Sequence, residues 1–323
     1  MSKKTLIQFA HHTWSPWRGC EHAYLMNGTE HPGCKNCYAE EMSHRNPTVL
    51  GEWGPEGTRA IGAESYLKLP YQWDRAAKAA GERRRVFPSL MDPFENRSDL
   101  EDFRHGLFRT IDDCPNLDFL LFTKRARWIR ALWPGGYRKN VWLVYSASDQ
   151  GSLDEGMPHL MRCRALVPVL GLSAEPLIGP ITFRPYSLTE RPCFVCKIED
   201  QLHDPRGSMS HPINCGWRHD QGREYVQGID WVIVGGESGP RARPCDIAWI
   251  RSIKEQCQEA GVACFVKQLG TRPIASEVVM DTDRGIAGST TTTGLSYVKD
   301  KKGGDMAEWP EDLPVREFPR VTI

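Results

Sequence analysis

Five stretches of the chain are continuous runs of apolar residues rich in β-branched and aromatic side chains. They span residues 117–122, 141–145, 166–172, 231–234 and 262–266. Runs without polar alternation are typical of strands that are buried on both faces. Two weaker segments, residues 86–90 and the neighbourhood of residues 13–17, bring the expected number of strands to about seven.

Segments with helical periodicity lie between these runs. Ser98 is expected to cap one helix, in which apolar residues recur every three or four positions. Asp246 is expected to begin another, which ends at Gly261. Alternating strands and helices predict an α/β fold built on a parallel sheet with right-handed crossovers.

Polar residues follow almost every apolar run. The carboxyl ends of parallel strands meet at one rim, where loops converge on a common crevice. The rim is therefore the predicted location of an active site. The residues at the predicted strand ends are Ser89, Asp92, Thr123, Lys124, Ser146, Ser148, Asp149, Ser173, Glu175, Glu237, Ser238, Lys267 and Gln268.

Composition narrows the class of protein. The 323 residues include 41 basic and 41 acidic side chains, so bulk positive charge does not hold this chain on nucleic acid. No apolar run approaches the roughly 18 residues needed to cross a bilayer, and the first residues lack the apolar stretch of a secretory signal. We therefore expect a cytoplasmic protein with no membrane partner.

Two polar segments interrupt the strand and helix pattern. Residues 184–228 contain three cysteines and three histidines without apolar periodicity, which predicts an insertion between two strands. Residues 288–323 are expected to form an irregular C-terminal tail. The remaining residues, 1–183 and 229–287, would form the main α/β domain.

The first cysteine group is Cys20, Cys34 and Cys37, which follow the first predicted strand. Three thiolates suit a [4Fe–4S] cluster with one iron open to a small-molecule ligand such as S-adenosylmethionine. Zinc is an alternative if His22 or His31 supplies a fourth ligand, and structural or redox-active thiols are a third. If a cluster is bound, Tyr38 would pack beside it.

The second cysteine group lies in the insertion. Cys193 and Cys196 have the spacing of a metal-binding knuckle, and Cys215 with His219 would complete a tetrahedral zinc site. His203 or His211 could replace His219. An auxiliary iron–sulfur cluster and an unligated loop are the alternatives, but a small polar segment gains order from a structural zinc.

Several blocks of the sequence resemble one known family. The segment 34–42, CKNCYAEEM, is similar to the start of the phage-associated three-cysteine-motif proteins, which resemble the radical S-adenosylmethionine superfamily. Further similar blocks are residues 84–87, 89–94, 121–125, 172–180, 229–240, 265–270 and 301–304, with Trp309. One feature departs from the superfamily motif: thirteen residues separate Cys20 from Cys34, where the usual motif has three between its first two cysteines. Similarly expanded loops occur in the 7-carboxy-7-deazaguanine synthases.

The resemblance implies a fold and a set of roles. The fold is a partial or full TIM-like (β/α) barrel of the radical S-adenosylmethionine type with a small metal-stapled insertion. The three cysteines of the first group would hold the [4Fe–4S] cluster. The residues expected to bind S-adenosylmethionine beside it are Tyr38, Ser89, Asp92, Ser146, Ser148, Asp149, Gly235, Gly236 and Glu237. Lys124, Glu175 and Lys267 would face the centre of the rim, to bind substrate, to transfer protons or to pair with one another.

These expectations predict a radical S-adenosylmethionine-like enzyme that receives an electron from a donor. Its substrate is expected to be a nucleobase, a nucleotide or DNA, with a peptide or protein as the next choice. The alternative is a non-catalytic, zinc-stabilised phage protein that binds nucleic acid or has a regulatory role.

Overall fold

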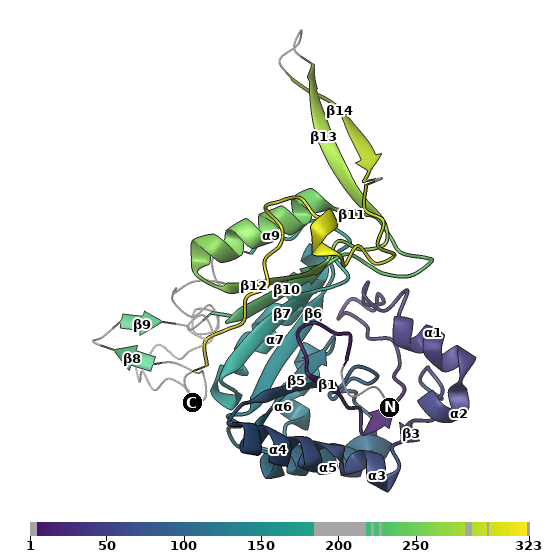
Figure 1. Ribbon diagram of the computed structural model, residues 1–323, viewed down its shortest axis with the longest axis vertical. Coiled ribbons are helices and arrows are strands. Elements are labelled where there is room, and N and C mark those ends of the chain that lie inside the picture. The colour runs from purple at the N-terminus through teal and green to yellow at the C-terminus, as the bar shows by residue number, and fades with distance from the viewer. Residues whose placement is uncertain are drawn as a thin grey trace, which may run out of the picture.

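The computed structural model describes residues 5–183, 218–220, 223–225, 228–281, 286–295 and 297–321. Its main feature is a seven-stranded sheet in which every pair of neighbours is parallel. The sheet curls into half of a barrel (Figure 1). In spatial order its strands are β1 (His12–Thr13), β4 (Arg84–Phe87), β5 (Leu117–Thr123), β6 (Val141–Ala147), β7 (Val169–Ala174), β10 (Trp231–Gly235) and β12 (Ala263–Gln268).

The predicted parallel α/β arrangement is confirmed. Proline explains two of the strand boundaries that differ from the prediction. Strand β7 begins at Val169 rather than at residue 166, because Pro168 has no N–H to donate to the sheet. Strand β4 ends at Phe87, directly before Pro88, rather than at residue 90.

Helices cover the outer face of the sheet. The expected cap of α9 is confirmed, since the Asp246 carboxylate accepts a hydrogen bond from the amide of Ala248 at 2.9 Å, and Gly261 ends the helix with a φ of +66°. Ser98 instead lies in a short 3₁₀ turn before α5 and makes no side-chain cap. The longer helices are α4 (Leu69–Ala80), α5 (Glu101–Asp113), α7 (Gln150–Met161) and α9 (Ile247–Ala260).

Shorter elements surround this frame. The helices are α1 (Tyr38–Arg45), α2 (Pro47–Leu50), α3 (Glu64–Leu67) and α6 (Ile129–Leu132), and the 3₁₀ turns are η1 (Ser98–Leu100), η2 (Ala126–Trp128), η3 (Arg164–Leu166) and η4 (Met306–Glu308). The remaining strands are β2 (Trp17–Arg18), β3 (Ala60–Ile61), β8 (Arg218–Asp220), β9 (Arg223–Tyr225), β11 (Cys245–Asp246), β13 (Pro273–Asp281) and β14 (Ile286–Gly294). No helix in the described ranges is long and apolar enough to span a bilayer.

Two hydrophobic clusters lie on opposite faces of the sheet. The outer cluster joins the strands to the helices. The inner cluster fills the concave side of the half-barrel with large side chains, and its rings of Phe9 and Phe122 stack with centroids 5.5 Å apart. The other buried members of this inner cluster are Leu120, Trp142, Val144, Val169, Trp231, Ile233 and Phe265. The filled interior leaves the carboxyl end of the sheet as the place for polar chemistry.

The C-terminal part is more ordered than the predicted irregular tail. Strands β13 and β14 form an antiparallel hairpin that projects from the rest of the chain (Figure 1). Further on, the amide of Val266 in β12 donates to the carbonyl of Val315 at 2.8 Å, and the amide of Glu317 donates to the carbonyl of Cys264 at 2.8 Å. The last segment thus covers the free edge of β12.

Candidate active site

The first cysteine group lies on the segment 20–37, here called the cysteine loop, which connects β2 to α1. The amide of Cys34 donates to the carbonyl of His31 at 2.8 Å, and the amide of Cys37 donates to the carbonyl of Cys34 at 3.1 Å. These turns place two thiols at the start of α1. All three thiols, including that of Cys20, are free, and Cys20 and Cys34 are buried.

The three cysteines of the loop affect the pKa of one lysine. Burial lowers the pKa of the Lys124 ammonium, but interactions with Cys34, Cys37, Asp92 and Cys20 outweigh burial and raise it above its usual value. Within the described residues, this ammonium forms no hydrogen bond and no ion pair. Lys124 is therefore a cation beside the cysteine loop that no carboxylate of the described residues pairs with at ion-pair distance.

Asp92 organises the end of β5. Its carboxylate accepts hydrogen bonds from the hydroxyl of Thr123 at 2.8 Å and from the amide of Phe94 at 2.9 Å. It also accepts from the amide of Lys124 at 3.2 Å and from Nη1 of Arg125 at 2.9 Å. A carboxylate offers about four acceptor positions, so a ligand at Asp92 must displace one of these donors. The structure thus gives Asp92 a positioning role, whereas the sequence predicts a direct cofactor contact.

Arg125 connects this strand end to the cysteine loop. Its Nη1 atom lies 3.5 Å from Sγ of Cys20, and its Nη2 atom donates to the carbonyl of Glu21 at 2.8 Å. Burial raises the pKa of the Cys20 thiol to about 12, and the positive charge of Arg125 opposes this shift. A thiolate that is buried without a positive partner is destabilised by the loss of its hydration. A metal bound in place of the thiol proton would compensate its negative charge.

Strand alternation gathers the predicted rim residues on the concave side. Residues two positions apart on a strand point to the same face. Phe122 and Val144 belong to the inner cluster, so Lys124 and Ser146 continue that face toward the carboxyl end. The same even spacing from inner-cluster residues holds for Ser89, Ser148, Glu175, Glu237 and Lys267. We call this end of the half-barrel its mouth.

Two of the predicted catalytic residues pair with each other at the mouth. Nζ of Lys267 lies 2.5 Å from Oε1 of Glu175, and both side chains are largely buried. The same Nζ lies 5.8 Å from the ring centroid of Phe9, so the pair sits directly above the inner aromatic cluster. Of the roles that the sequence leaves open, pairing is the one that this geometry displays.

The cysteine loop packs tightly onto the mouth at Gly33. A Cβ atom at this position would lie 2.6 Å from Oγ of Ser148, 3.0 Å from Cε of Lys124 and 3.3 Å from Nδ1 of His31. Within the described residues, the Ser148 hydroxyl is buried without a hydrogen-bond partner, and the His31 imidazole lies near the backbone of Ser146. Burial, together with the positive charge of nearby Lys124, lowers the pKa of His31 to about 3. The imidazole is therefore neutral at physiological pH.

A second contact joins the cysteine loop to the loop after β10. Nδ2 of Asn36 donates to Oε2 of Glu237 at 3.1 Å and to the carbonyl of Arg241 at 2.9 Å. Glu237 also pairs with Arg243, whose guanidinium donates to both carboxylate oxygens. Hydrogen bonds from Arg243 and Asn36 outweigh burial, which acts in the opposite direction, and lower the pKa of Glu237. Glu237 is thus an ionised anchor for the loop.

Three other predicted cofactor residues have structural partners. The Asp149 carboxylate caps α7 by accepting from the amide of Ser152 at 2.9 Å. A Cβ at Gly236 would lie 2.2 Å from the carbonyl oxygen of Leu269, so the approach of β12 explains this glycine without a ligand. A Cβ at Gly235 would lie 3.0 Å from the carbonyl oxygen of Gln268, the last residue of β12.

Tyr38 is the first residue of α1, directly after Cys37, and its contact with a cluster stays a prediction. Its hydroxyl donates to the carbonyl of Ser89 at 2.6 Å. Burial raises the pKa of this hydroxyl, and the charges of Cys37 and Glu175 raise it further. Half of the residue surface is exposed, and the hydrogen bond to Ser89 joins α1 to the segment that follows β4.

The second cysteine group falls outside the described residues. This applies to Cys193, Cys196 and Cys215, and also to the alternative ligands His203 and His211. The backbone of His219 lies in β8, but its side chain is not described. The predicted zinc site stays a prediction.

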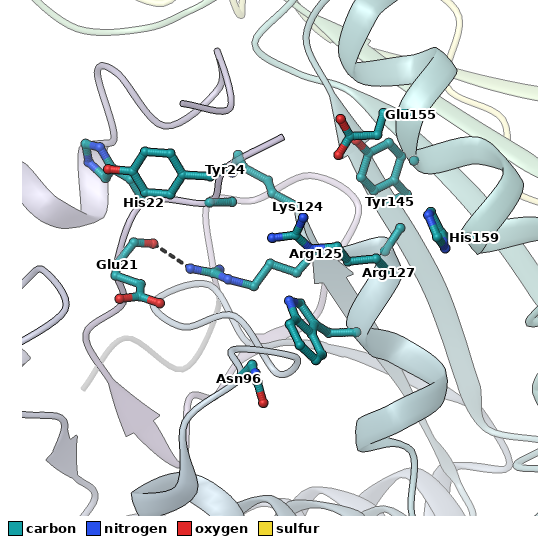
Figure 2. A pocket seen from close by; sticks show the side chains of 14 residues that line it. Glu21, His22, Tyr24, Asn96, Lys124, Arg125, Arg127, Tyr145, Glu155 and His159 are labelled. Atoms are coloured by element: carbon teal, nitrogen blue, oxygen red, sulfur yellow. Dashed lines mark hydrogen bonds between the residues drawn. The ribbon is translucent and has the colours of Figure 1, made fainter. Parts of the chain in front are cut away.

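A cavity of about 210 Å³ opens beside the cysteine loop (Figure 2). Residues of the cysteine loop line one side, the segment after β5 lines the middle, and α7 lines the other side. The charged and aromatic side chains that line it are Glu21, His22, Tyr24, Lys124, Arg125, Arg127, Trp128, Tyr145, Glu155 and His159. His22 is held from outside the cavity, because its ring nitrogens lie 2.8 Å from Glu40 and 3.2 Å from Glu30.

Four residues of this site were not predicted as part of it. Arg125, Asn36 and Gly33 each make a long-range contact that no local pattern encodes. The sequence offered only their neighbours as a signal. Arg125 directly follows Lys124, and Gly33 and Asn36 lie in the cysteine loop. The sequence suggests His31 only as a zinc ligand, whereas in the structure its ring lies against Gly33, whose amide donates to Nδ1.

Comparison with known proteins identifies one family. A family model described as "Protein of unknown function (DUF5131)" matches residues 4–304. No curated protein and no solved structure matches the chain. The matched range includes the cysteine loop and all seven strands of the main sheet.

Proposed function

We propose that this chain, which belongs to the DUF5131 family, is a radical S-adenosylmethionine-type enzyme whose Cys20, Cys34 and Cys37 hold a [4Fe–4S] cluster. One observation carries the proposal: three free thiols belong to one loop, and that loop packs against Lys124 at the mouth of a parallel half-barrel. The finer fold assignment, a partial (β/α) barrel of the radical S-adenosylmethionine type, is part of this proposal.

The donor set fits such a cluster. Three thiolates leave one iron without a protein ligand, and the cations of Lys124 and Arg125 would stabilise the negative charge of the cluster. Among the described residues, no three His, Cys, Asp or Glu side chains surround a single ion position. Cysteines on a cubane cluster bind different iron atoms and so lie farther apart than the ligands of one zinc ion. Three thiols suit a cluster with one open iron, and zinc at this loop is the alternative that metal analysis distinguishes.

The mouth offers polar groups for S-adenosylmethionine. When bound next to a reduced cluster, this cofactor supplies a 5′-deoxyadenosyl radical. Ser148 has a buried hydroxyl without a partner, and Ser146 lies two residues before it on the same face. We assign these hydroxyls, with Ser89, to cofactor binding. Asp92, Asp149 and Glu237 position the surrounding loops instead.

We assign the Lys267–Glu175 pair to proton transfer or to substrate binding. Its position above the inner aromatic cluster keeps it away from bulk water on that side. Substrates of this enzyme would be nucleobases, nucleotides or DNA, and an electron-donor protein would reduce the cluster.

Metal analysis after anaerobic purification tests the proposal. We expect about four irons and four sulfides per chain in the wild type, and loss of both in the Cys34→Ser/Cys37→Ser variant. The matched control is Cys163→Ser, which changes a buried free cysteine away from the site and should retain iron. Zinc at the first cysteine group, with no iron after reconstitution, would reject the enzyme and favour a zinc-stabilised binding protein.

A further inference from the structure

The cavity beside the cysteine loop combines unpaired cations with aromatic rings. Lys124 faces it without an ion-pair partner in the described residues, and so does Arg127, which is exposed on η2. Arg125 differs, because Asp92 neutralises it at 2.9 Å. Two cations are therefore available to a ligand.

The carboxylates at the cavity are placed at its two sides. Oε2 of Glu155 accepts a hydrogen bond from the amide of Met26 at 2.8 Å, which ties α7 to the cysteine loop. Figure 2 shows Glu155 beside Tyr145 on the α7 side and Glu21 on the opposite side, with the cations between them. The middle of the cavity is thus its positively charged part.

Aromatic surface adjoins these cations. The rings of Trp128 and Tyr24 line the cavity, and the Arg127 guanidinium carbon lies 5.8 Å from the centroid of the Trp128 ring. The cavity volume of about 210 Å³ is below the range of roughly 300–1,000 Å³ that is typical of drug-sized ligands. It suits one ring or one anionic group of a substrate whose remainder extends outward.

We propose that this cavity binds the anionic group of a small aromatic substrate, a carboxylate or a phosphate, through Lys124 and Arg127, with its ring against Trp128. This inference rests on the proposed function, since it names the substrate class of the same site. Lys124 contacts both places: its Cε atom approaches Gly33 in the cysteine loop, and its side chain lines the cavity. An anion held there would lie next to the thiols.

Fluorine NMR of protein labelled with 5-fluorotryptophan tests the proposal, with the Trp128 signal identified by Trp128→Phe. Two probe pairs distinguish the anion: adenosine 5′-monophosphate against adenosine, and benzoate against benzyl alcohol. We expect the anionic member of at least one pair to shift the Trp128 signal and to bind at least about tenfold more tightly than its neutral partner.

Arg127→Gln should weaken that binding about 10- to 100-fold, as expected for a lost charge-assisted hydrogen bond. Arg130→Gln is the matched control, because Arg130 is exposed one turn away and does not line the cavity. Equal binding of the anionic and neutral probes, no shift with any probe, or full binding by Arg127→Gln would overturn the proposal.

Iron is measured in each NMR sample, so that the two proposals fail separately. Protein without iron that still binds the anion would reject the enzyme and keep the anion site. Iron-loaded protein that binds no anionic probe would reject the anion site alone.

Discussion

Gly33→Ala probes the contact that holds the cysteine loop on the mouth. The added Cβ would lie 2.6 Å from the Ser148 hydroxyl oxygen and 3.0 Å from Cε of Lys124. Ser148 is fully buried, so its oxygen has no free space in which to move. Overpacking of this kind typically costs about 1–3 kcal/mol, and the loop would have to shift, with Cys34 directly attached to the altered residue.

Ser148→Ala provides the matching rescue. Its hydroxyl is buried without a hydrogen-bond partner, so removal alone should leave the free energy of unfolding unchanged or raise it by up to about 1 kcal/mol. In the double variant the nearest clashing atom is gone, and the lysine chain can move aside. We expect the double variant to regain at least about 1 kcal/mol relative to Gly33→Ala.

Urea denaturation of the four proteins measures this coupling, with m-values compared to check that the same transition is followed. Iron content after reconstitution should follow the same order, lowest in Gly33→Ala and restored in the double variant. If the two substitutions are additive within about 0.5 kcal/mol, the loop does not pack on the mouth through this contact.

Other contacts give independent predictions. Asn36→Asp places a carboxylate 3.1 Å from that of Glu237 and should lower iron retention after gel filtration, whereas Asn46→Asp, outside the site, should not; equal retention in both would refute the Asn36 anchor. His12 stacks on Trp73 with centroids 4.2 Å apart, and burial lowers its pKa from 6.5 to about 4. A lowered histidine pKa gives stability that is complete above pH 6.5 and is lost as pH falls toward 4, because the unfolded chain takes up a proton first. His12→Phe should therefore flatten the pH dependence of unfolding between pH 6.5 and 4, while His105→Phe, at an exposed site, should leave it unchanged. Gly156→Ala would place a Cβ 2.0 Å from Cζ of the Tyr145 ring and should cost at least about 2 kcal/mol in thermal unfolding; a wild-type melting temperature would show that α7 does not pack as described.

The frame of this fold was predictable because its signals are local. The run at residues 141–145 is apolar throughout, and the run at 117–122 is interrupted only by Asp118, which indicates strands buried on both faces whatever their neighbours are. The cap at Asp246 and the stop at Gly261 are equally local. The hairpin of β13 and β14 escaped prediction because Thr290–Thr293 in a polar stretch has strand propensity but no apolar alternation.

The candidate site was predictable in composition but not in its contacts. Order along the chain placed Lys124, Glu175 and Lys267 at one rim, and strand parity accounts for this. Which carboxylates face a ligand and which hold other residues depends on distant partners. Asp92, for example, is occupied by donors from the end of β5, 31 to 33 residues away along the chain. The spacing of residues along the sequence does not show that these donors already fill the acceptor positions of the carboxylate.

The central claim is that a cluster on the cysteine loop binds S-adenosylmethionine. The most direct test is the electron paramagnetic resonance spectrum of the dithionite-reduced protein, recorded with and without S-adenosylmethionine, together with an assay for 5′-deoxyadenosine. The account predicts a cluster signal that changes when the cofactor is added, with 5′-deoxyadenosine formed by the wild type and not by Cys34→Ser/Cys37→Ser. A reduced cluster whose signal is unaffected by the cofactor, with no 5′-deoxyadenosine formed, would contradict it.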